Sequence, residues 1–353
     1  MIPKPSTDQI NYLNMGLMAL SALLAFQFPF ELFLFVYAVL GPLHYLTEIS
    51  WLHDRQYYTQ GRLDYLFLVL AGILVTVFNF GWIPGVPPVA GTIVTSTAFF
   101  AALGFVLSPK LSARLAGLLG ALLLSVVLSL FRFFGPTFDI FLPTLIHVFL
   151  FTGFFILVGA LRGGSRSGLF SLVVFGGMGL SFLLVHPSHA QYQVSDYVRD
   201  SYGYFREDGN ASSVFIALNH YLVSVLGLGP FNTPVQPLPD FVKKINDFIY
   251  RDPKALALMS FISFAYTYHY LNWFSKTSII RWYEVPRSRF VGVLVLWGIS
   301  LALYRANYAL GLKWLFFLSF AHVLLEFPLN HLTFINIGRE LGKTVLEKAE
   351  KTA

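Results

Sequence analysis

Two histidine–glutamate pairs with the same spacing lie near opposite ends of the chain, each inside a long apolar stretch. They are His44/Glu48 and His322/Glu326. On a helix, residues four apart share a face, with Cβ atoms about 5–6 Å from each other. Each pair can therefore offer one imidazole and one carboxylate to the same metal ion. Ionisable groups within a membrane are costly and usually face a bundle interior, so buried pairs of this kind indicate a functional site.

A third histidine follows each pair five residues after the glutamate, although the chain has only nine histidines. These residues are His53 and His331. Nine residues turn a helix by about 900°, which places each of them on the face opposite the first histidine. We expect His53 to lie at the membrane interface. A helix break at Pro328 could turn His331 back toward the site, and we keep both histidines as candidate metal ligands.

The composition predicts that these residues lie in a polytopic membrane protein. Of the 353 residues, 56% are hydrophobic and 12% are charged, and the mean hydropathy is +0.65. The chain has no cysteine, which excludes thiolate metal sites, iron–sulfur clusters and disulfides. A metal would need imidazole and oxygen ligands, which favours iron, zinc, manganese or copper. The net charge of +6 accompanies no nucleic-acid module, so we expect membrane lipids and no nucleic acid as partners.

The apolar stretches predict an all-α protein with about ten transmembrane helices in a single membrane domain, residues 1–353. The expected spans are 10–27, 30–52, 63–84, 89–108, 114–134, 138–161, 167–186, 255–275, 289–305 and 308–334. Lysine and arginine gather in alternate loops, which predicts cytoplasmic N- and C-termini. An outer-side insertion, residues 187–254, has two apolar patches that are too short to span, Val214–Leu228 and Phe241–Tyr250. We expect them to form interfacial or re-entrant helices.

Two further intramembrane histidines, His147 and His269, lie in the sixth and eighth expected spans. These spans run in the same direction as those of His44 and His322, and all four histidines lie at comparable depth. Each lone histidine could instead hydrogen-bond a backbone carbonyl, and each histidine–glutamate pair could be a structural ion pair. Four imidazoles and two carboxylates resemble the ligand sets of helical non-haem iron sites.

Other residues complete the expected site. Tyr268 and Asn272 lie beside His269 on its helix, where they could hydrogen-bond ligands or take part in oxidative chemistry, although aromatic packing also explains the tyrosine. His186, His189 and His220 belong to the outer side, and we expect them to be surface residues.

The order of these motifs resembles that of the Brp/Blh family of membrane β-carotene 15,15′-dioxygenases. Phe151 stands where the family has an acid, Trp273 stands where it has a second histidine, and the first and last motifs have glutamate, Glu48 and Glu326, where the family has aspartate. The resemblance implies an iron-dependent oxygenase that acts on a lipophilic polyene. The matching segments are Gly41-Pro42-Leu43-His44-x3-Glu48, Ile146-His147, Tyr268-His269-Tyr-Leu-Asn272 and Ala321-His322-x3-Glu326.

These patterns support three hypotheses. The first is a membrane enzyme with a mono- or dinuclear non-haem iron centre, in which dioxygen oxidises a hydrophobic or lipid-like substrate; zinc and manganese rank below iron. The second is a proton- or metal-ion-coupled transporter that uses the same pairs. The third is a zinc hydrolase, although six ligands exceed the usual three plus water. A haem held by two histidines would leave the glutamates unexplained.

Overall fold

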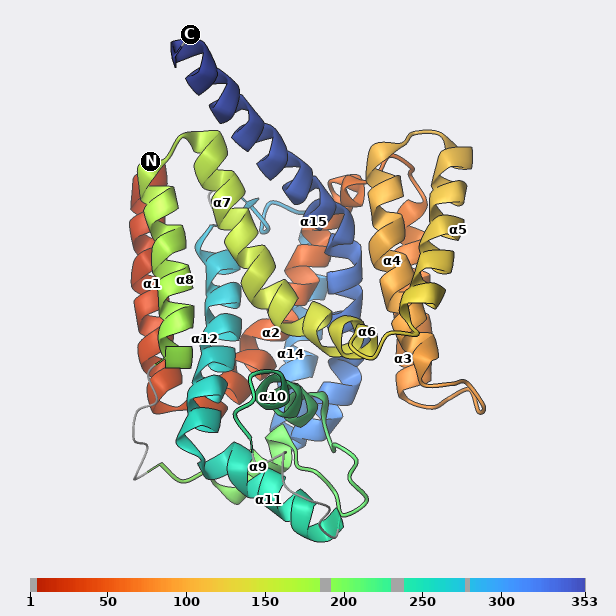
Figure 1. Cartoon of the computed structure of the whole chain (residues 1–353), viewed down its shortest axis with the longest axis vertical. Coiled ribbons are helices and arrows are strands. Elements are labelled where there is room, and N and C mark those ends of the chain that lie inside the picture. The colour runs from red at the N-terminus through yellow and green to blue at the C-terminus, as the bar shows by residue number, and fades with distance from the viewer. Residues whose placement is uncertain (1–4, 185–191, 230–237, 277–279, 353) are drawn as a thin grey trace. The chain divides into compact units, whose positions relative to one another are not determined.

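The computed structural model describes residues 5–184, 192–229, 238–276 and 280–352, and in these ranges it is built from helices without a named strand (Figure 1). The chain is therefore all-α, as predicted. The elements in order are α1 (Thr7–Gln27), α2 (Pro29–His53), η1 (Gln56–Tyr58), α3 (Asp64–Asn79), α4 (Val89–Leu107), α5 (Leu111–Leu128), α6 (Phe134–Pro136), η2 (Thr137–Phe151), α7 (Thr152–Gly163), α8 (Arg166–Leu184), α9 (Asp196–Tyr202), α10 (Val214–Val225), α11 (Leu238–Arg251), α12 (Pro253–Ser275), α14 (Arg287–Ala306) and α15 (Tyr308–Thr352).

The contacts divide the chain into two compact units, each assembled from segments that are far apart in sequence. Unit 1 holds residues 1–12, 41–172 and 276–353, and unit 2 holds residues 13–40 and 173–275. The boundary falls inside α1, α2 and α8, so these helices contribute to both units. The single-domain description of the whole chain stays a prediction.

Unit 1 is a bundle of apolar helices around α15, the helix drawn in dark blue in Figure 1. Helices α3 and α4 pack on α15, and α5 packs on α4. Gly104 and Gly117 face each other where α4 and α5 meet, and a Cβ atom added to either would make an ordinary van der Waals contact, 3.9 Å from the other glycine's Cα. The buried core includes Leu68, Leu324 and Phe327, each fully enclosed.

Three helices of unit 1 run in the same direction past one another. The rings of His44 and His322 lie 5.6 Å apart, and one turn later Glu48 and Glu326 are within hydrogen-bonding reach, so α2 and α15 are parallel there. The ring of His147 lies 5.0 Å from that of His322. Farther along the same helices, the ring of Phe151 lies 5.7 Å from that of Phe334. The segment η2–α7 is therefore parallel to α15 as well.

Eight described helices are long and apolar enough to span a membrane: α1, α2, α4, α5, the joined α6–η2–α7, α8, α14 and α15. The ten crossings counted from the sequence add α3 and α12 to this set. The number ten and the side of the membrane on which each terminus lies stay predictions.

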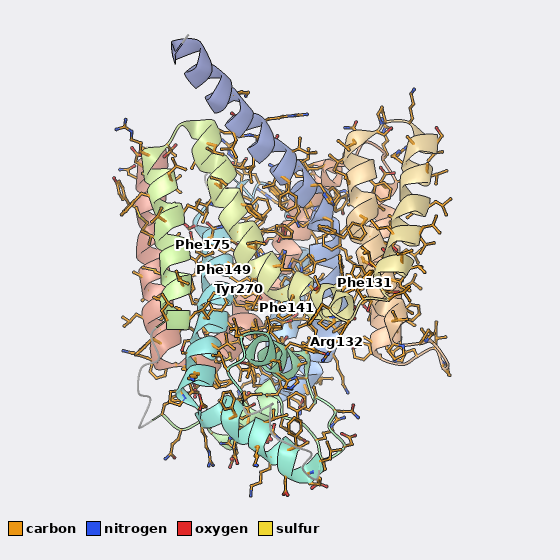
Figure 2. All side chains as sticks on the ribbon, in the orientation of Figure 1. Phe131, Arg132, Phe141, Phe149, Phe175 and Tyr270 are labelled. Atoms are coloured by element: carbon orange, nitrogen blue, oxygen red, sulfur yellow. The ribbon has the colours of Figure 1, made fainter. Side chains whose placement is uncertain are left out.

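Unit 2 joins parts of α1, α2 and α8 to α12 and to the three helices of the insertion. The ring of Phe175 on α8, labelled in Figure 2, lies 5.3 Å from that of Tyr268 on α12. In the insertion, α11 buries Val242, Ile245 and Ile249 along one face and has charged residues on the other. Helices α10 and α11 contain 12 and 14 residues, too short to span a bilayer, as predicted.

Candidate metal centre

A cluster of buried imidazole and carboxyl groups forms inside unit 1. His44 Nε2 lies 3.0 Å from Glu48 Oε2 on the next turn of α2. Ligand atoms of His44, Glu48 and His322 all lie within 4.8 Å of one another, close enough to hold one metal ion. None of the three side chains is more than 3% exposed. The helix spacing seen in the sequence therefore does bring a nitrogen and an oxygen ligand together.

His147 and Glu326 extend the cluster on its other side. His147 Nε2 lies 3.2 Å from His322 Nε2, and His147 Nδ1 lies 3.5 Å from Glu326 Oε2. Both residues are 1% exposed. Five of the eight sequence-predicted ligands, from α2, η2 and α15, therefore meet in one buried place.

The electrostatic centre of the cluster is the pair of carboxyl groups. Glu48 and Glu326 are within hydrogen-bonding reach of each other, and both are buried. Two ionised carboxylates at this separation repel each other strongly, so the pair must share a proton or face a cation. The neighbouring histidines supply nitrogen ligands for such a cation.

The ring of His322 has an aromatic neighbour on one face. The ring of Tyr45 stacks on it, with centroids 4.2 Å apart and an interplanar angle of 26°. Nε2 of His322 faces His147, and its Nδ1 is buried without a hydrogen-bond partner among the described residues.

Each of the three helices that carry the cluster contains a proline near its ligands. Pro42 precedes His44 by two residues, Pro143 precedes His147 by four, and Pro328 follows Glu326 by two. Proline removes a backbone donor and distorts a helix. The distortion is largest in η2, which has wide π-helical turns and a non-helical residue after Pro143. π-Helical turns are rare and are frequent at functional sites.

Two predicted ligands lie away from the cluster. His53, at the end of α2, is exposed, and its Nδ1 lies 3.5 Å from the hydroxyl of Tyr57. Burial raises the pKa of the Tyr57 hydroxyl to about 12. His331 does not turn toward the site, because α15 continues unbroken through Pro328. His331 Nε2 instead lies 2.7 Å from the carbonyl oxygen of Phe99 on α4, on the opposite face of α15 from His322, so the alternative of a break at Pro328 does not hold.

The remaining candidates belong to unit 2. His269 is 8% exposed on α12, and its role as a ligand stays a prediction. The hydroxyl of Tyr268 donates hydrogen bonds to the amide oxygens of Asn14 and Asn272, at 3.2 and 3.4 Å. The bond to Asn14 joins α12 to α1, and the bond to Asn272 lies within α12. The catalytic role of Tyr268 and Asn272 stays a prediction. His220 is half-buried on α10, and His186 and His189 lie outside the described residues.

Sequence reasoning missed two residues beside the cluster. Tyr45, adjacent to His44, stacks on the ring of His322, and that contact joins helices almost 280 residues apart, so no local pattern could reveal it. Asn330 is fully buried on α15. It could have been found, because it continues the four-residue spacing of His322 and Glu326 by one further turn.

The donor set fits a metal ion of borderline hardness. Three imidazoles and two carboxylates suit iron, zinc, manganese or copper, and the absence of thiolates argues against softer sites. No match to the chain is found among protein-family models, curated proteins or solved structures.

Proposed function

We propose that the protein is a membrane-embedded metalloenzyme that holds one or two iron ions in this cluster and uses dioxygen to oxidise a lipophilic substrate. The observation that carries the proposal is the buried carboxyl pair of Glu48 and Glu326 between three imidazoles. The same residue types, supplied by facing helices, form the di-iron sites of helical bundles. Zinc and manganese rank below iron in this role. Zinc has no redox chemistry of its own.

Iron bound here would supply the redox chemistry that activates dioxygen. The protein's own residues would perform the other tasks. Glu48 and Glu326 offset the charge of the ion and can bridge two ions. His44, His147 and His322 are neutral ligands, which leave the net charge of the site low.

The surroundings of the cluster favour an apolar substrate. The neighbouring core of unit 1 is lined by side chains such as Leu52, Val323 and Phe327, all nearly or fully enclosed. Such a lining excludes water, which protects reactive species and strengthens electrostatic interactions. A lipid-like or carotenoid-like molecule can reach this region from the bilayer without passing through water.

The parallel course of α2 and α15 bears on the transporter hypothesis. A motif that occurs twice could mark an inverted repeat, which is common in secondary transporters. In an inverted repeat, one copy of the motif would run in the opposite direction across the membrane. Both copies instead run in the same direction past the site. The oxidoreductase is therefore the better supported function.

The test combines metal analysis with dioxygen consumption. We expect protein purified in lipid nanodiscs and loaded anaerobically with ferrous iron to retain one or two irons per chain. When air is admitted with a carotenoid or unsaturated lipid, dioxygen should be consumed and an oxidised product formed. The matched controls are His44→Ala, which should lose both iron and activity, and His53→Ala on the same helix, which should keep both. Stoichiometric zinc without dioxygen uptake would indicate a hydrolase, and the absence of any stoichiometric metal would refute the proposal.

A further inference from the structure

Asn330 is a buried amide without a partner. Its side chain is 0% exposed, and neither Oδ1 nor Nδ2 has a hydrogen-bond partner among the described residues. A buried polar group that lacks a hydrogen bond costs about 1–3 kcal/mol. Proteins seldom retain such a group in an apolar core, so Asn330 needs a partner that this state of the protein does not provide.

A matching acceptor lies one turn away. Oε1 of Glu326 is also buried and has no hydrogen-bond partner among the described residues. The two residues are four apart on α15, which places them on one face, with a rise of about 6 Å between their Cα atoms. The amide Nδ2 is a donor and the carboxylate Oε1 is an acceptor, so each can satisfy the other through side-chain rotation alone.

The neighbours of Asn330 on the same helix are already engaged. His331 bonds to the carbonyl oxygen of Phe99, and the hydroxyl of Thr333 donates to the carbonyl oxygen of Leu329 at 2.8 Å. Each of these groups already donates its hydrogen, so neither can donate to Asn330 Oδ1 without losing that bond. Among the described residues, Glu326 Oε1 is a buried acceptor without a partner one turn from Asn330 on the same helix.

We propose that Asn330 is a positioning residue that donates a hydrogen bond to Glu326 and orients its carboxylate toward the metal. The inference rests on the proposed metal centre and deepens it by adding a residue outside the ligand set. The carboxylate of a metal site is ordinarily hydrogen-bonded by a second residue, and the loss of such a partner weakens metal affinity by about 10- to 100-fold. Asn330 acts through Glu326 and does not touch the ion.

The experiment measures metal affinity in full-length protein in nanodiscs, with Co²⁺ as the probe in competition with a chromophoric chelator. Asn330→Leu removes the amide at similar volume and should raise the Kd for Co²⁺ by about 10- to 100-fold, with the number of bound ions unchanged. The matched control is Thr333→Val, which removes a buried hydroxyl from the same helix and should leave the Kd unchanged. If Asn330→Leu does not fold, Asn330→Ala serves in its place, since it also removes the donor.

A double-mutant cycle separates positioning from a general effect on stability. In a Glu326→Gln background, Asn330→Leu should weaken Co²⁺ binding no further, because the carboxylate that Asn330 orients toward the metal is already absent. An equal loss in both backgrounds would overturn the inference, as would an unchanged Kd in the single variant. A drop of one bound ion would also overturn it, because Asn330 would then be a direct ligand. If the wild-type protein binds no metal, the proposed function fails; if the wild type binds metal but Asn330→Leu binds it equally well, only this inference fails.

Discussion

Replacement of Glu326 by glutamine should have opposite effects on the metal-free and metal-loaded protein. Glutamine keeps the shape of the side chain but removes its charge. In the metal-free state, Glu326 faces Glu48 within hydrogen-bonding reach. Two unit charges about 4 Å apart repel each other by about 4 kcal/mol at an effective dielectric constant of about 20. A proton shared by the pair relieves much of this repulsion, so the gain from Glu326→Gln lies between zero and about 4 kcal/mol.

The metal-loaded state should respond in the other direction. A ligand present at about 1,000 times its Kd stabilises the folded state by about 4 kcal/mol. Glu326→Gln removes an anionic ligand, so most of this gain should disappear. Outside the carboxyl pair, Glu326 Oε2 lies 3.5 Å from His147 Nδ1, a contact too long to return much energy.

The assay is thermal unfolding in nanodiscs under anaerobic conditions, with and without ferrous iron. We expect the metal-free variant to unfold at or above the wild-type temperature and to gain little from iron. The matched control is Glu340→Gln on the same helix, where the carboxylate pairs with the exposed Lys343 at 3.0 Å and the effect should be within about 0.5 kcal/mol. A metal-free variant that is clearly less stable than the wild type and still gains fully from iron would show that Glu326 is a structural partner, and the metal centre would have to be abandoned.

Further predictions concern the ligands, the topology and the core. His322→Ala should lose bound metal, as measured by mass spectrometry, whereas His331→Ala on the same helix should keep it; equal metal content in the two variants would contradict the site assignment. Tyr45→Leu should keep the metal but weaken Co²⁺ binding, because the ring of His322 loses its stacked neighbour, and a calorimetric Kd equal to that of the wild type would contradict this. A reporter fused to the C-terminus should read as cytoplasmic, and a reading from the outer side would overturn the predicted orientation. Leu324→Ala, in the core of unit 1, should lower the free energy of unfolding by about 2–5 kcal/mol through the cavity it leaves, while metal content stays unchanged.

The sequence alone determined the class of fold and the pairs that carry the site. Apolar stretches of about 20 residues can satisfy their backbone groups in a bilayer only as helices, which is why an all-α membrane protein could be predicted before the structure was known. The separation of His44 from Glu48, and of His322 from Glu326, is a local property of one helix. The same periodicity places His331 on the face of α15 opposite His322, and there it contacts Phe99 on α4.

Only the tertiary structure decided which helices meet. The sequence predicted that the spans of His44, His147 and His322 run in the same direction. It could not show that α2, η2 and α15 are neighbours and that His147 lies 3.2 Å from His322, because helix neighbours depend on packing between segments far apart in the chain. The effect of Pro328 also required the structure, which shows α15 continuous through this residue. Asn330 is fully buried one turn beyond Glu326 for the same reason. Periodicity determines the face on which a side chain lies, and tertiary packing determines what that face contacts.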